Sequence, residues 1–176
     1  MSYEVLKSEK VYKGRVFEIE KDVITLPNGK TAQRETIRHN GAAAMIPIDD
    51  TGKIIFVRQY RHSARALTLE IPAGTIELGE KPIVCAEREI QEEIGYKSNN
   101  IKFLLSMYSA IGFCSEVLHI YLCTDLVESK LEEDADEFIT LERYSLEESI
   151  DLIFKGEICD SKTIGAIFAY KEYLSK

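Results

Sequence analysis

The chain has 176 residues, of which 45% are hydrophobic and 30% charged, and its formal net charge is −8 at pH 7. This length suits one domain, or one domain with a small appendage, and it is enough to bury a real core. The acidic balance disfavours a nucleic-acid partner, and no apolar stretch is long enough to cross a bilayer.

The N-terminal residues mix charge with apolar side chains and lack the apolar core of a signal peptide, so we expect a cytoplasmic protein without a membrane partner. The cysteines are scattered without a Cys-x-x-Cys pair, and the histidines show no metal-ligand spacing. In a reducing compartment the cysteines are most simply free thiols.

Strand patterns dominate the first half of the chain and return after residue 100. Residues 3–40 are predicted to be extended, with a hairpin over 16–38 that turns at Pro27-Asn28-Gly29. Further strands are predicted at residues 41–48, 53–60, 68–74, 101–108, 117–125 and 138–144.

Three segments predict helices: 82–94, 145 to about 155, and about 161–174. The first has Pro82 in its first turn and Gly95 just past its end. The second opens with a Ser-x-x-Glu capping box. The acidic run at 132–137 predicts a solvated loop. Strands, a helix, more strands and two helices together predict a mixed α/β (α+β) fold.

The helix predicted at 82–94 has two distinct faces. Its apolar face (Ile83, Ala86, Ile90, Ile94) should pack on a sheet. Glu89, Glu92 and Glu93 fall in an adjacent arc, where like charges repel. Hard cations such as Mg²⁺ prefer oxygen ligands, so a divalent-metal site for a phosphate substrate would offset this repulsion. A Glu-rich surface helix without a site is the alternative.

The stretch around this helix resembles the Nudix box, G-x5-E-x7-R-E-U-x-E-E-x-G-U, where U is apolar. The matching residues are Gly74, Glu80, Arg88, Glu89, Ile90, Glu92, Glu93 and Gly95, with Tyr96 at the last apolar position. The resemblance implies an α/β/α sandwich with a mixed sheet. It also implies Mg²⁺ (Mn²⁺ as a possible substitute) held by Glu89, Glu92, Glu93 and the Ala73 carbonyl, with Glu80 in support.

The flanks resemble the ADP-ribose pyrophosphatase subfamily: residues 57–61 (Val-Arg-Gln-Tyr-Arg), 69–74 (Leu-Glu-Ile-Pro-Ala-Gly), 112–116 (Gly-Phe-Cys-Ser-Glu) and 160–164 (Asp-Ser-Lys-Thr-Ile). This implies an N-terminal strand region, 1–40, that pairs across a homodimer, and a catalytic domain, 41–176. Ile111 stands where the subfamily usually has proline.

The resemblance further implies roles for individual residues in hydrolysing ADP-ribose to AMP and ribose 5-phosphate. The expected catalytic residues are Glu116 as first choice of general base, Glu92 as second choice, and Arg88 beside the cluster. The expected substrate-binding residues are Arg34 and Glu35 from the partner, Arg58, Arg61, Gly112 and Phe113. From the residues alone, Arg34 and Glu35 could instead form a cross-strand ion pair.

Several readings of the substrate stay open. Another nucleotide sugar or a dinucleotide cofactor (GDP-mannose, NADH, FAD) or a nucleoside triphosphate would use the same chemistry. A non-catalytic ADP-ribose-binding sensor is an alternative of another class, which the intact acidic cluster disfavours. An mRNA-processing member of the family is disfavoured by the acidic charge.

Overall fold

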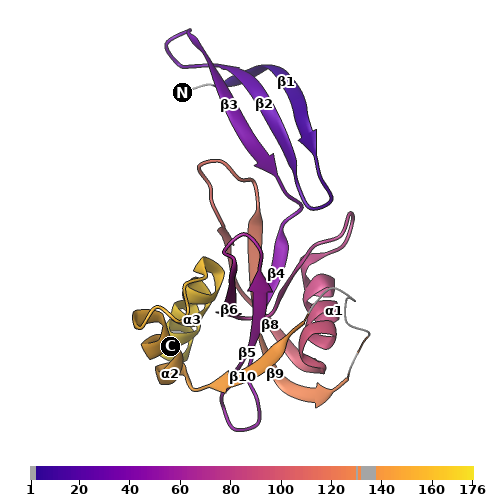
Figure 1. Ribbon diagram of the computed structural model, residues 1–176, viewed down its shortest axis with the longest axis vertical. Helices are drawn as coiled ribbons and strands as arrows, with labels where there is room; N and C mark the ends of the chain where they lie inside the picture. Colours follow the sequence, from indigo (N-terminus) through magenta and orange to yellow (C-terminus); the bar gives the residue numbers. More distant parts are fainter. Residues whose placement is uncertain (1–2, 130, 132–137) are drawn as a thin grey trace. The chain divides into compact units, whose positions relative to one another are not determined.

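The computed structural model describes residues 3–129, 131 and 138–176, so the predicted acidic loop at 132–137 lies outside the described residues (Figure 1). Contacts divide the chain into two compact units, Met1–Gly41 with Tyr108–Val117, and Ala42–Met107 with Leu118–Lys176. The elements in chain order are β1 (Glu4–Lys13), β2 (Glu18–Thr25), β3 (Thr31–Arg38), β4 (Ala42–Pro47), β5 (Ile54–Arg61), β6 (Ala66–Glu70), β7 (Ala73–Thr75), α1 (Pro82–Ile94), β8 (Tyr96–Tyr108), β9 (Val117–Glu128), β10 (Thr140–Tyr144), α2 (Leu146–Phe154) and α3 (Ser161–Leu174).

The first unit is built on an antiparallel sheet in the order β1-β2-β3 (Figure 1). The predicted hairpin is present: β2 and β3 pair from Glu18 opposite Arg38 to Thr25 opposite Thr31. Its turn closes with a hydrogen bond from the Leu26 amide to the Lys30 carbonyl, and Gly29 has a φ of 79°, which glycine adopts without steric cost. All ten residues of β1 are exposed.

The second unit places sheets between helices. One sheet has the order β7-β4-β9-β8, and β4 runs parallel to β9 but antiparallel to β7; β10, β5 and β6 form an antiparallel sheet. Side chains of β4 alternate between two apolar clusters. One cluster includes the apolar face of α1, and the other includes α2 and α3, which lie on the opposite side (Figure 1). The predicted α/β/α sandwich with a mixed sheet is confirmed.

The ends of the first two helices follow their sequence signals. Pro82 occupies the first turn of α1, and Gly95 closes the helix in the left-handed region at φ 75° with its amide bonded to the Ile90 carbonyl. The capping box of Ser145 and Glu148 opens α2. No helix of the described chain has the length and apolar character that a bilayer crossing requires.

The sequence predicts that Ile164, Ile167 and Phe168 lie on one face of α3, and the structure differs in part. Ile167 is buried as expected, but Phe168 is 39% exposed, whereas Lys162 and Thr163 are buried. Positions 163, 166, 167 and 170 recur at intervals of three and four, so they form the buried stripe and leave position 168 outside it.

Candidate active site

The strand β7 leads through residues 76–81 into α1, and this short connection positions the first acidic side chain. The Glu80 amide donates to the Glu77 carbonyl at 3.0 Å, and the Glu77 amide donates to Glu80 Oε2 at 2.9 Å. These reciprocal bonds turn the Glu80 carboxylate back toward α1, where Arg88 contacts it.

Arg88 gathers three carboxylates. Its Nε donates to Glu80 Oε1 at 3.2 Å, and its Nη1 donates to Glu89 Oε1 at 2.6 Å and to Glu92 Oε2 at 2.8 Å. Burial lowers the pKa of Arg88, but the hydrogen bonds to Glu80 and the charge of Glu89 outweigh burial and raise it. The sequence placed Arg88 beside the cluster, and the structure shows that it contacts three of the carboxylates.

The remaining acidic residue of the helix is buried against β7. Glu93 is 6% exposed, and its Oε2 accepts a hydrogen bond from the Ala73 amide at 3.1 Å. Next to Ala73, a Cβ on Gly74 would lie 1.8 Å from Cδ and Oε1 of Glu89. A side chain at position 74 would therefore displace the Glu89 carboxylate, and glycine leaves that carboxylate in place.

The acidic side chains of this cluster fit a hard divalent cation, since each offers carboxylate oxygen. Within the described residues, no group of three or more His, Cys, Asp and Glu side chains is arranged to hold a metal ion. Instead, Glu80, Glu89 and Glu92 meet at one guanidinium, and two of them approach the same nitrogen. The predicted ligands Glu89 and Glu92 therefore already face a common point.

Two predicted phosphate-binding arginines lie on β5 and have carboxylate partners. Arg61 Nε and Nη2 donate to the two oxygens of Glu70 at 2.9 and 2.8 Å. Arg58 forms an ion pair with Glu142 on β10. Glu70 lies within the matched segment 69–74, but the sequence analysis gave it no role. An acidic residue between Leu69 and Ile71 in a short apolar strand was the feature that could have indicated one.

The predicted catalytic loop at 109–116 is tied by its backbone to β3 within the first unit. The Ile37 amide donates to the Phe113 carbonyl at 2.8 Å, and the Ser115 amide donates to the Ile37 carbonyl at 2.9 Å. Glu116 Oε1 lies 3.4 Å from His39 Nδ1. Sequence reasoning missed His39, which follows directly after β3.

The other predicted substrate residues of this unit are exposed. Gly112 and Phe113 lie at the surface of the loop, and Arg34 and Glu35 lie on β3. Arg34 Nη1 donates to the Gln33 carbonyl at 2.7 Å. Because Arg34 and Glu35 are successive residues of a strand, their side chains point to opposite faces.

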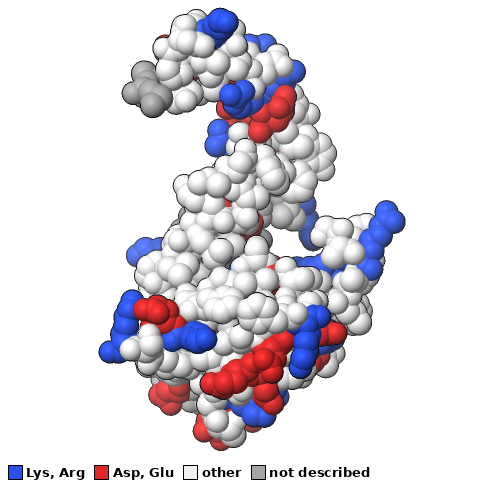
Figure 2. Space-filling view, turned by 90° about the vertical axis from the view of Figure 1, so that its left-hand side faces the viewer, with Lys and Arg blue, Asp and Glu red and all other residues white. Residues whose placement is uncertain are grey.

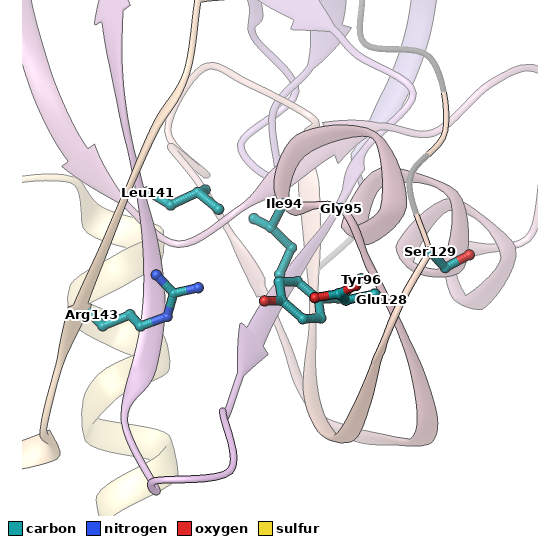
Figure 3. Close-up of a pocket in the computed structure, with 7 residues that line it drawn as sticks. All are labelled: Ile94, Gly95, Tyr96, Glu128, Ser129, Leu141 and Arg143. Atoms are coloured by element: carbon teal, nitrogen blue, oxygen red, sulfur yellow. The ribbon is translucent and has the colours of Figure 1, made fainter.

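A cavity of about 460 Å³ opens at the C-terminal end of α1 (Figure 3). Leu141 and Arg143 of β10 face Ile94 and Tyr96 across it. None of the predicted site residues lines it. On the face drawn in Figure 2, basic and acidic side chains of the described residues are interspersed rather than gathered into one basic tract.

Comparison with known proteins decides the family. The family model of the NUDIX domain matches residues 38–164. The chain belongs to the Nudix family. It is 41% identical over 166 residues to the methanol dehydrogenase activator of Bacillus methanolicus, covering 92% of this chain and 89% of the relative. It is 37% identical over 164 residues to the ADP-ribose pyrophosphatase of Bacillus subtilis, with the same coverage.

The fold gives the same answer. A crystal structure of an ADP compounds hydrolase superposes with a TM-score of 0.90 at 27% identity, covering 99% of this chain and 95% of that one. This protein is thus a Nudix pyrophosphohydrolase that is similar over nearly its whole length to ADP-ribose pyrophosphatases. Nudix hydrolases generally use divalent metal cations, and the oxygen-rich cluster on α1 fits that requirement.

Proposed function

We propose that this Nudix hydrolase cleaves the diphosphate of ADP-ribose, with Mg²⁺ as cofactor, to give AMP and ribose 5-phosphate. The observation that carries the proposal is the gathering of Glu80, Glu89 and Glu92 at Arg88, beside the buried Glu93. Similarity to ADP-ribose pyrophosphatases supports the substrate.

Glu89, Glu92, Glu93 and the Ala73 carbonyl are the proposed metal ligands, and Mn²⁺ is a possible substitute for Mg²⁺. When bound, the cation would neutralise the diphosphate and lower the pKa of a coordinated water. The hydrogen bond between Glu93 and the Ala73 amide supports this set, because it holds a proposed ligand from α1 next to the proposed carbonyl ligand of β7.

Arg61 and Arg58 are proposed to bind the substrate phosphates. A guanidinium is planar and presents donors on more than one edge. Arg61 uses Nε and Nη2 for Glu70 and is 39% exposed, so another edge is available to an anion. Arg34 and Glu35 of a second copy, with Gly112 and Phe113, complete the proposed substrate contacts, and the exposure of all four supports this role.

In the proposed reaction, water attacks one phosphorus and the bond from that phosphorus to the bridging oxygen breaks. Glu116 takes the proton of the attacking water, with Glu92 as the second candidate. Arg61 stabilises the negative charge that develops on the phosphate oxygens. The exposure of Glu116 supports this choice, because its side chain is 23% exposed and accessible to a water molecule.

A homodimer that forms through the N-terminal strands is the proposed assembly, in the cytoplasm and without nucleic acid. Support comes from β1, where the large apolar side chains Val5, Leu6, Val11 and Tyr12 are each more than half exposed. Exposed apolar clusters of this kind mark interaction surfaces. Sedimentation of the chain, compared with a variant in which Leu6 and Val11 are changed to Lys, tests this assembly.

The substrate is tested by mass spectrometry of products from ADP-ribose, GDP-mannose, NADH, FAD and ATP, with Mg²⁺, with Mn²⁺ and with EDTA. We expect AMP and ribose 5-phosphate from ADP-ribose with Mg²⁺, at a higher kcat/KM than for the other compounds. Faster cleavage of another compound would refute ADP-ribose as the preferred substrate and leave the proposed cleavage of a diphosphate unchanged.

A second candidate is a regulator that binds ADP-ribose without cleaving it. The name of one relative, methanol dehydrogenase activator, describes an effect on another enzyme and favours keeping this candidate. Calorimetry separates the two: binding of ADP-ribose in Mg²⁺ without any product would support the regulator and refute the hydrolase.

A further inference from the structure

We propose that Lys162, at the start of α3, is a positioning residue for this reaction: through Glu70 it keeps Arg61 turned toward the substrate's diphosphate. The inference rests on the proposed function, because it assigns the diphosphate to Arg61. It concerns the second unit alone, where β5, β6 and α3 lie together.

The position of Lys162 is energetically unfavourable for a cation that lacks compensating partners. The residue is 8% exposed, and buried ammonium groups lose hydration. It also stands in the first turn of a helix, where the helix dipole is positive and repels a cation. Two carboxylates offset both costs: Lys162 Nζ donates to Glu70 Oε2 and, at 3.0 Å, to Asp160 Oδ2.

Glu70 is the point at which Lys162 and Arg61 meet. It is 3% exposed, and its two oxygens accept from Arg61, from Lys162 and from the Thr68 hydroxyl, the last at 2.7 Å. The bidentate bond fixes the plane of the Arg61 guanidinium. Two cations, Lys162 and Arg61, face two carboxylates, Glu70 and Asp160, so their charges balance. Without Lys162 the group would carry a net negative charge that weakens the attraction of Arg61 for an anion.

The same helix turn also fixes the segment that leads to the acidic cluster. Thr163 Oγ1 accepts from the Ile71 amide at 3.0 Å and donates to Asp160 Oδ2 at 2.6 Å. Two residues further on, the Ala73 amide donates to Glu93. The start of α3 therefore holds this segment at two successive residues. Lys162 binds the side chain of Glu70, and Thr163 binds the backbone amide of Ile71.

Arg61 lies within electrostatic reach of the acidic cluster. Its pKa is raised above the usual value chiefly by the hydrogen bonds to Glu70, against the effect of burial, and the charge of Glu93 contributes. An arginine held between Glu70 and the region of Glu93 is placed to meet a diphosphate bound there.

Lys162→Met tests the inference, because it removes the charge and keeps most of the chain length. Glu70 is then neutralised by Arg61 alone, so Arg61 should attract anions less. We expect Kd for α,β-methylene-ADP, a diphosphate that resists hydrolysis, to rise about tenfold by calorimetry, equal to about 1.4 kcal/mol. KM for ADP-ribose should rise with it, and Lys162→Arg should restore both values.

The matched control is Lys171→Met, the same change at an exposed lysine of α3, which should leave Kd and KM unchanged. A double-mutant cycle separates positioning from general damage. In an Arg61→Ala background, Lys162→Met should change Kd by less than twofold. If Lys162→Met does not fold, Lys162→Gln, which keeps a donor and removes the charge, takes its place in the cycle.

Equal weakening in both backgrounds, or no weakening in either, would overturn the positioning role. A wild-type protein that neither binds the analogue nor cleaves ADP-ribose would instead contradict the proposed function. The two failures are thus distinguishable by the behaviour of the wild type.

Discussion

The variant Gly74→Ala tests quantitatively whether the site needs a residue without a side chain at position 74. The new Cβ would lie 1.8 Å from Cδ and Oε1 of Glu89, whereas Cβ contacts essentially never fall below 3.0 Å. The Glu89 carboxylate must therefore move by at least about 1.2 Å, by the same steric limit. Moving it breaks its hydrogen bond from Arg88 Nη1.

Both stability and activity should respond. Loss of a hydrogen bond between charged groups costs about 1.5–3 kcal/mol, so we expect the free energy of unfolding to fall by about 2 kcal/mol in urea titrations. A misplacement of about 1 Å in a catalytic group costs about 10²-fold. We expect kcat/KM for ADP-ribose at saturating Mg²⁺ to fall by that factor.

The control is the Glu89→Ala background, where the atoms that the new Cβ meets are absent. There Gly74→Ala should change the free energy of unfolding by less than about 0.5 kcal/mol. If the loss of stability is the same in both backgrounds, the clash is not with Glu89. Wild-type kcat/KM in the single variant would refute the reasoning entirely.

Three further predictions follow from the charged groups of the second unit. Glu93→Gln should lower kcat at least 10²-fold with far-UV circular dichroism unchanged; near-normal turnover would remove Glu93 from the proposed ligands. Chelation with EDTA should abolish AMP release and leave the circular dichroism spectrum unchanged, because the hydrogen bonds of Arg88 hold the three carboxylates without a cation; a loss of secondary structure would contradict this. Hydrogen bonds from Arg61 and the charge of Lys162 outweigh burial and lower the pKa of Glu70 from 4.5 to about 2, so its stabilisation is complete above pH 4.5 and is lost as pH falls toward 2. At about 1.36 kcal/mol per unit this is about 3 kcal/mol, so in urea titrations Glu70→Gln should lose less stability than the wild type between pH 5 and pH 2, by about this amount.

Local signals in the sequence were enough to predict α1 and the start of α2. Pro82, Gly95 and the apolar face of α1 specify that helix within thirteen residues, and the structure agrees at both ends. The capping box likewise specifies the start of α2. Most predicted strands are also present, because alternation and turn signals act over a few residues. The single strand predicted at 68–74 is wrong: Ile71 and Pro72 interrupt it, and its two parts, β6 and β7, belong to different sheets.

Contacts between residues far apart in the chain could not be predicted from the sequence. Lys162 and Glu70 are 92 positions apart, and nothing local distinguishes Lys162 from a solvated lysine at the start of a helix. The contact of Arg88 with Glu80 could not be predicted, because helical spacing describes only the residues of one helix, whereas Glu80 is brought back by the preceding loop. Roles for Glu116, Arg34 and Glu35 stay predictions, as does the division at residue 40.

The pairing of Ile37 with the 109–116 loop has a practical consequence for anyone who shortens this chain. Removing the first forty residues would strip the loop of both backbone bonds to Ile37 and of the His39 contact with Glu116. A truncated protein would therefore lose order around its proposed base as well as its N-terminal sheet. Inactivity of such a fragment would then say nothing about subunit association, which is better probed by point changes on β1.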